Sequence, residues 1–124
     1  MESSFYSKFL KLSGLALDRE FPPAGTLSDE ELTAFEANLS TMDEQHLGFA
    51  ITLLAHHAPV RLLPHLYWML GDLRTGVWTA AERSILLLPK TSITPQVRSI
   101  IQAAVQKRCG NTGDSWILSQ LANG

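Results

Sequence analysis

A helix-start pattern occurs twice in this 124-residue chain, and a proline follows each copy at a similar distance. Residues 41–44 read Thr-Met-Asp-Glu and are followed by Pro59, whereas residues 79–82 read Thr-Ala-Ala-Glu and are followed by Pro95. Threonine with glutamate three residues later is typical of a capping box, in which both side chains bind free backbone N–H groups of a first helical turn. The copies are 36 to 38 residues apart, which is the period of repeats built from pairs of helices.

The rest of the chain also reads as helices separated by short loops. Nothing alternates between apolar and polar residues over a convincing window, so no strand is predicted. Ser28 with Glu31 forms a further capping box, and Thr94 precedes a proline at a first helical position. We expect helices over residues 3–17, 28–39, 41–57, 59–72, 79–88, 94–109 and 114–121, with a loop at 18–27. Pro64 either kinks the fourth of these or splits it into a short turn and a helix from 64 to 72.

The residues after each proline carry a family resemblance. Val60-Arg61 follows Pro59, and Val97-Arg98 follows Pro95 after one intervening residue. Over residues 28–109 this pattern resembles HEAT and armadillo repeats, and the resemblance implies stacked helical hairpins that bury a common core. The Asp that often precedes this Arg in HEAT repeats is absent, so an irregular helical bundle is the alternative. We predict an all-α fold of six to seven helices, packed as antiparallel hairpins in one domain over residues 1–124.

Composition limits the class of protein further. The chain is 45% hydrophobic and only 18% charged, so it can bury a core and does not read as a disordered tail. Its longest apolar stretch is interrupted by histidines and an arginine, so no transmembrane helix is expected. No basic-then-apolar leader is visible, and the single cysteine, Cys109, excludes an internal disulfide. These features predict a cytoplasmic protein.

The two halves of the chain carry opposite charge. Residues 1–60 contain nine acids and three bases, whereas residues 61–124 contain three acids and seven bases, giving −6 and +4. Most of the acids lie in the region 18–44. Helix capping by Glu31 and Glu44 accounts for part of this acidity, and an ordinary solvated face is one interpretation. The other is a surface for a basic partner, since such a field speeds encounter with cations.

A second candidate surface lies in the middle of the chain. Four residues spaced i, i+4, i+7 and i+11 would share one helical face if Pro64 does not break the register. Trp and Arg dominate protein interfaces, although a partly exposed face packed on a neighbour is the simpler interpretation. Together with the acids that capping leaves unexplained or exposed, the predicted partner-binding residues are Asp18, Glu20, Glu30, Glu36, Arg61, His65, Trp68 and Asp72.

No catalytic, metal or cofactor motif accompanies these patterns. His46 and His57 share a helix face but are separated by about 16 Å at ~1.5 Å per residue, too far to hold one ion. His56 and His57 are adjacent and diverge, and no carboxylate stands at helical ligand spacing from His65. We therefore expect no metal site, no cofactor and no catalytic residues.

The patterns together favour a protein that acts by binding another protein. Within that class we expect a small bacterial inhibitor or immunity protein that presents carboxylates to a basic toxin, such as a nuclease. The alternatives are a structural or adaptor subunit and a small enzyme with a pocket at His57, His65 or Asp72. A sequence pI near 6.0 makes a nucleic-acid partner unexpected. The sequence does not determine the oligomeric state.

Overall fold

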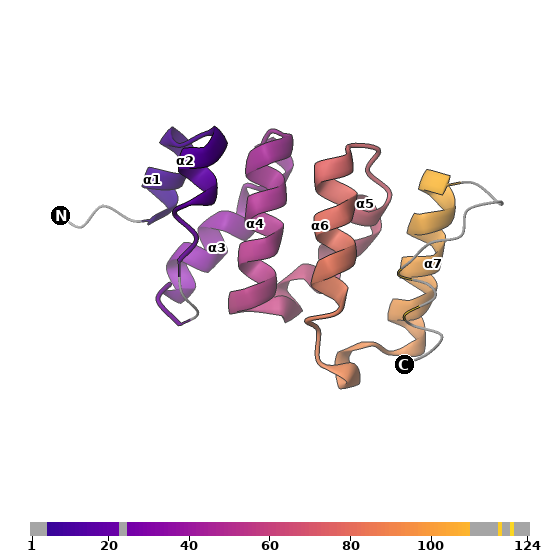
Figure 1. Cartoon of the computed structure of the whole chain (residues 1–124). Coiled ribbons are helices and arrows are strands. Elements are labelled where there is room, and N and C mark those ends of the chain that lie inside the picture. The colour runs from indigo at the N-terminus through magenta and orange to yellow at the C-terminus, as the bar shows by residue number, and fades with distance from the viewer. Residues whose placement is uncertain (1–4, 23–24, 110–116, 118–119, 121–124) are drawn as a thin grey trace.

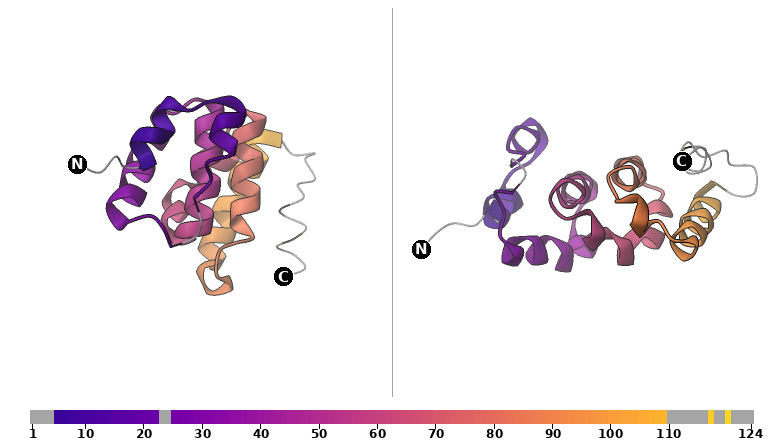
Figure 2. Two further views of the ribbon diagram at one scale, coloured as in Figure 1. Left: turned by 60° about the vertical axis from the view of Figure 1, so that its left-hand side comes forward. Right: turned by 90° about the horizontal axis from the view of Figure 1, so that it is seen from below.

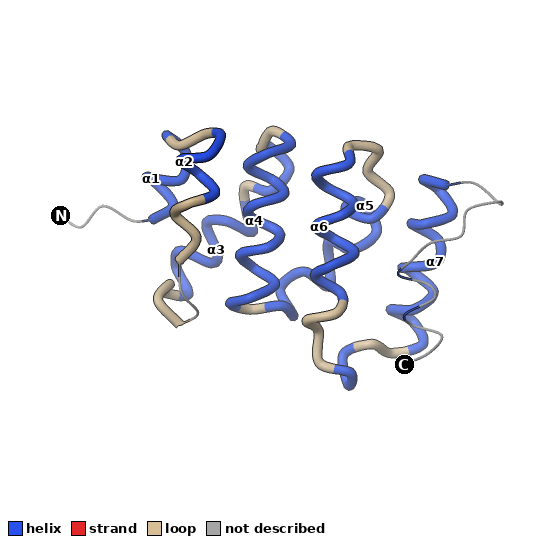
Figure 3. Tube along the Cα trace, viewed as in Figure 1, coloured by secondary structure: helices blue, strands red, loops and turns tan. Residues whose placement is uncertain are grey.

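In the computed structural model, every regular element is helical. The structure describes residues 5–22, 25–109, 117 and 120, apart from the side chains of Asp18 and Cys109. Within this part there are seven α-helices and three short 3₁₀ helices and no strands (Figures 1 and 3), which confirms the predicted all-α class. The α-helices are α1 (Phe5–Lys11), α2 (Gly14–Asp18), α3 (Asp29–Ala37), α4 (Glu44–His57), α5 (Leu66–Leu70), α6 (Thr75–Ile85) and α7 (Pro95–Cys109). The 3₁₀ helices are η1 (Leu39–Thr41), η2 (Pro59–His65) and η3 (Lys90–Ser92).

The helices form two layers. Helices α4 and α6 lie side by side in one layer, whereas α3, η2 with α5, and α7 form the other (Figures 1 and 2). The α4–α6 pair is the most extensive contact between elements, and α5 packs against both α6 and α7. A two-layer arrangement does not by itself establish a structural repeat, so the stack of HEAT-like hairpins remains a prediction.

Two of the predicted helix starts are confirmed and two are wrong. The Ser28 hydroxyl accepts the Glu31 N–H at 3.2 Å, and the Thr94 hydroxyl accepts the Val97 N–H at 3.2 Å. By contrast, Thr41 lies in η1, and Thr79 lies inside α6, where its hydroxyl donates to a backbone carbonyl one turn earlier. The repeated Thr-x-x-Glu pattern therefore marks neither helix start.

Other residues begin α4 and shape the neighbouring segments. Asp43 is the N-cap of α4 and accepts the His46 N–H at 2.8 Å, so the helix starts two residues later than Thr41 would place it. The predicted helix over residues 3–17 is two helices, α1 and α2, and Gly14 begins the second with a φ of +57°. Pro64 lies in η2, and α5 begins only at Leu66. The predicted last helix, 114–121, lies outside the described residues except for positions 117 and 120.

Helix α4 is the most buried element, as its apolar composition predicts. Its buried side chains are Leu47, Phe49, Ala50, Ile51, Leu53, Leu54 and Ala55. They join residues from the second layer, such as Phe35 of α3 and Met69 of α5, in one core. Among the described residues, no helix combines the length and apolarity that a membrane span requires.

Helices α4 and α6 touch through two glycines. A Cβ atom on Gly48 would lie 2.8 Å from the carbonyl oxygen of Gly76, and one on Gly76 would lie 2.9 Å from Glu44 Oε2. The contact with backbone leaves no room for a methyl group on Gly48, whereas a methyl group on Gly76 would displace the Glu44 side chain. The glycines are therefore needed for close approach of the two helices, since both have ordinary helical backbone conformations.

Carboxylates from neighbouring helices cap two helices. Glu44 of α4 accepts the Gly76 N–H of α6 at 2.8 Å, where the N-cap residue itself makes no side-chain bond. Glu31 of α3 likewise accepts N–H groups of Phe5 and Tyr6 at the start of α1. The expectation that Glu31 and Glu44 bind their own caps is therefore wrong. Each instead ties two helices together at a positive helix terminus.

A buried ion pair fixes α7. Arg108 donates to Glu82 of α6 at 2.8 Å and to the Leu70 carbonyl at the end of α5 at 2.8 Å. Its guanidinium carbon also lies 4.1 Å from the centre of the Trp78 ring. The side chains of Glu82 and Arg108 are 7% and 8% exposed. The Thr-x-x-Glu pattern predicts that Glu82 caps a helix, and this prediction is wrong. Glu82 instead anchors the second layer to the first through Arg108.

The glycine contact predicts an unusual response to alanine. Replacing a helical glycine by alanine normally stabilises a helix by about 1 kcal/mol. The change Gly48→Ala should instead lower the free energy of unfolding by about 1–3 kcal/mol, because the new methyl group overpacks the α4–α6 contact. Urea denaturation measures this, with the exposed Gln102→Ala of α7 as the control, expected within ~0.5 kcal/mol of wild type. A Gly48→Ala protein as stable as wild type would contradict the packing described.

Candidate functional site

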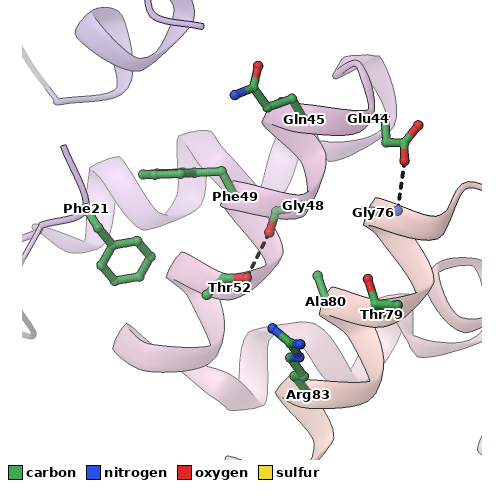
Figure 4. A pocket seen from close by; sticks show the side chains of 10 residues that line it. All are labelled: Phe21, Glu44, Gln45, Gly48, Phe49, Thr52, Gly76, Thr79, Ala80 and Arg83. Atoms are coloured by element: carbon green, nitrogen blue, oxygen red, sulfur yellow. Dashed lines mark hydrogen bonds between the residues drawn. The ribbon is translucent and has the colours of Figure 1, made fainter. Parts of the chain in front are cut away.

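An open groove lies between α4 and α6 (Figure 4). It has a volume of about 570 Å³. Its lining residues come from α4, from α6 and from the segment that follows α2. They are Phe21, Glu44, Gln45, Gly48, Phe49, Thr52, Gly76, Thr79, Ala80 and Arg83.

Small residues hollow the groove and aromatic rings form one side of it. Gly48 and Ala80 lie where α4 and α6 approach, so no long side chain fills the space between the helices (Figure 4). The rings of Phe21 and Phe49 lie next to each other with centroids 5.3 Å apart. Phe49 belongs to the core, whereas Phe21 is 37% exposed. The groove therefore offers an apolar surface on a closely packed pair of helices.

The hydroxyl and amide groups in the groove are already engaged. The Thr52 hydroxyl donates to the Gly48 carbonyl at 2.9 Å, and the Thr79 hydroxyl donates within α6. The Gln45 amide accepts from the Gly14 N–H at 3.0 Å and donates to the Gly14 carbonyl at 2.9 Å. A molecule in the groove would thus find few free hydrogen-bond donors.

The two ends of the groove carry opposite charge. Glu44 stands at the end where α4 and α6 begin, with Asp43 beside it and the Asp72–Arg74 pair close by. Hydrogen bonds to Asp72, with the charges of Asp72, Glu44 and Asp43, raise the pKa of Arg74 above its usual value although burial opposes this. Three carboxylates thus face one guanidinium at this end.

Arg83 of α6 stands at the other end of the groove (Figure 4). It is exposed, and within the described part of the chain no carboxylate forms an ion pair with it. The groove is therefore negative at one end and positive at the other.

Four of the predicted residues meet within the layer formed by α3, η2 and α5. Arg61 and His65 of η2 both bind the carboxylate of Glu36 in α3, at 3.2 Å and 3.1 Å respectively. The Trp68 indole N–H donates to His65 Nδ1 at 3.2 Å. We call these residues the Glu36 cluster (Glu36, Arg61, His65 and Trp68). Glu36, His65 and Trp68 line a second hollow of about 490 Å³ next to η1.

The hydrogen bonds determine the protonation state of this cluster. An indole N–H can only donate, so His65 Nδ1 must accept, and the ring proton lies on Nε2, where it is donated to Glu36. Burial alone would raise the pKa of Glu36, but the hydrogen bonds from His65 and Arg61 prevail and hold that pKa below its usual value. The four side chains thus satisfy one another, and the charges of Glu36 and Arg61 balance.

The other predicted binding residues do not join this cluster. Asp72 lies beyond the end of α5 and pairs with Arg74 at 2.8 Å. The i+11 spacing fails because η2 is a 3₁₀ helix with about three residues per turn, and α5 ends at Leu70. Glu20 pairs with Lys8 at 2.9 Å, and Glu30 is exposed in the first turn of α3. The side chain of Asp18 lies outside the described residues.

The groove itself was not among the predicted sites. A glycine in the middle of an otherwise apolar helix, as at Gly48, is the one sequence signal for it, because such a glycine often marks a close approach. That signal does not name Gly76 as its partner. In the described part of the chain, no group of three or more His, Cys, Asp or Glu residues could hold a metal ion.

Comparisons with protein-family models, with curated proteins and with solved structures gave no match for this chain.

The cluster predicts a loss of stability in acid. The pKa of Glu36 is held below its usual value near 4.5, so its stabilisation is complete above that pH and is lost as the pH falls through the lower, folded-state pKa. The free energy of unfolding of wild type should therefore decrease as the pH falls below about 4.5.

Glu36→Gln tests the origin of this effect. The variant should be less stable than wild type at pH 7, because Arg61 loses its charged partner, and the gap should narrow towards pH 3. Urea denaturation from pH 7 to pH 3 measures both proteins, with Glu30→Gln at an exposed position as the control. A gap that stays constant over this range would show that the Glu36 carboxylate is not stabilised by these partners.

Proposed function

We propose that this chain acts by binding another protein, and that the groove between α4 and α6 is its binding surface. The observation that carries the proposal is the groove itself, an apolar, aromatic-sided hollow with an acidic and a basic end. Protein-binding sites usually combine an apolar centre with charged residues at the rim. Removal of the apolar area from water is favourable, and the charges orient the partner.

The construction of the groove supports this function. Its floor is the glycine contact of α4 and α6, and Glu44 ties the start of α6 to α4. Binding to such a fixed surface loses little conformational entropy, so more of the contact energy appears as affinity. The Glu36 cluster is less suited to the role, because its polar groups are already satisfied and its charges cancel.

The charge distribution supports a narrower proposal. The N-terminal half carries a net charge of −6, and Asp43, Glu44 and Asp72 bring carboxylates to one end of the groove. We infer a partner with a basic surface and propose an inhibitor of the immunity type, a cytoplasmic bacterial protein that covers the basic active site of a toxin such as a nuclease.

Charge reversal in the groove tests the binding surface. The full chain is co-expressed with the product of the adjacent gene, and the affinity of the purified pair is measured by calorimetry. Arg83→Glu reverses the positive end of the groove, so it should lower the affinity of a partner whose charges complement both ends by about tenfold or more, which corresponds to about 1.4 kcal/mol. Arg83 is exposed in the last turn of α6, so its reversal should lower the stability by only about 1 kcal/mol through the helix dipole, and the variant should stay folded under the conditions of the binding measurement.

Two controls make the result specific. Lys11→Glu reverses an exposed charge in the last turn of α1 that does not line the groove, and it should change the affinity less than about threefold. Ala80→Leu fills the groove without a charge change and should also weaken binding. Equal effects of Arg83→Glu and Lys11→Glu would place the binding surface elsewhere, and failure of any stoichiometric complex to form with the neighbouring product would contradict the inhibitor proposal.

A further inference from the structure

The geometry of the groove also points to the kind of segment that fills it. We infer that the groove takes an amphipathic α-helix of the partner, with basic side chains over the Glu44 end and acidic side chains over the Arg83 end. This inference rests on the proposed function and specifies the occupant of that site.

The hydrogen-bond state of the groove favours a helical occupant. An extended peptide brings unpaired backbone N–H and C=O groups, which must find partners when they are buried. The hydroxyls of Thr52 and Thr79 donate within their own helices, and the Gln45 amide is engaged with Gly14. The walls are helices, so they offer no sheet edge either. A helix satisfies its own backbone and needs no such partners.

The length of the groove fits two helical turns. Its lining residues extend from Glu44 to Thr52 along α4 and from Gly76 to Arg83 along α6. At ~1.5 Å per residue these stretches measure about 10–12 Å. Apolar anchors at positions i, i+4 and i+7 of an occupant span about the same distance. The short side chain of Ala80 leaves the groove open for such anchors, and Phe21 and Phe49 border it on the side of α4 that faces away from α6 (Figure 4).

The end charges fix the order of charges along the occupant. Glu44, Asp43 and Asp72 against Arg74 make the first end negative, and they stand close enough to act together on the pKa of Arg74. Arg83 makes the second end positive. A segment with Lys or Arg at one end and Asp or Glu about two turns away complements both ends when its basic end lies over Glu44, and the reversed placement meets repulsion at both ends.

Peptide display tests this occupant directly. A library of random 14-residue peptides is selected on the immobilised full chain, and the enriched sequences are measured by fluorescence anisotropy and circular dichroism. We expect apolar residues at i, i+4 and i+7, basic residues towards one end and acidic residues towards the other, and a gain of helicity on binding. Arg83→Glu should weaken the enriched peptides by about tenfold or more, whereas Lys11→Glu should change their affinity less than about threefold.

The selection also has a sharper readout. When the selection is repeated on Arg83→Glu, the groove end at residue 83 is negative instead of positive. The peptide end that lies over it should then carry basic residues in place of acidic ones. Unchanged charge order on the variant, or enrichment of proline-rich or extended sequences, would overturn the helical occupant. Absence of any enrichment would overturn it as well. These results are distinguishable from failure of the proposed function, which would appear as partner binding that does not respond to Arg83→Glu.

Discussion

The contact between Gly48 and Gly76 is the constraint on which the rest of the structure depends. It brings α4, the most buried helix, against α6 at a distance that no side chain would allow. Glu44 then binds the first turn of α6, so the two helices are held both by packing and by a capping hydrogen bond. The groove lies beside this contact and is left open by the short side chain of Ala80. The contact that stabilises the helix pair therefore also forms part of the proposed binding surface.

Much of the acidity of the chain serves the fold. Glu31 and Glu44 cap neighbouring helices, Glu82 pairs with Arg108, and Glu36 is bound by Arg61 and His65. These carboxylates join elements that are distant in sequence, which is why their loss would affect packing as well as charge. Asp43, Glu44 and Asp72 also bind groups of the fold, but they lie near one another and their three charges exceed the single charge of Arg74. Their excess charge is what a partner would meet at this end of the groove. The proposed role of the charge asymmetry in binding is therefore limited to this end of the groove.

Sequence reasoning succeeded where local chemistry decides the structure. The caps at Ser28 and Thr94 follow from bonds that each residue makes within one turn, and the burial of α4 follows from its composition. It failed at Thr41 and Thr79, because Asp43 is the better-placed cap and because the cap of α6 comes from Glu44, 32 residues earlier. Part of the Glu36 cluster was predicted from helical spacing. The groove was not predicted. The close approach of α4 and α6 leaves only one glycine in each segment of the sequence, and neither glycine indicates its partner.

The central claim is that a partner occupies the groove between α4 and α6. The most direct measurement is the change in backbone amide NMR signals of the full chain when the purified partner is added. The largest changes are predicted at Gly48, Thr52, Gly76, Ala80 and Arg83, with small changes at Glu36, His65 and Trp68. Changes concentrated on the Glu36 cluster, with the α4 and α6 groove residues unaffected, would contradict the claim.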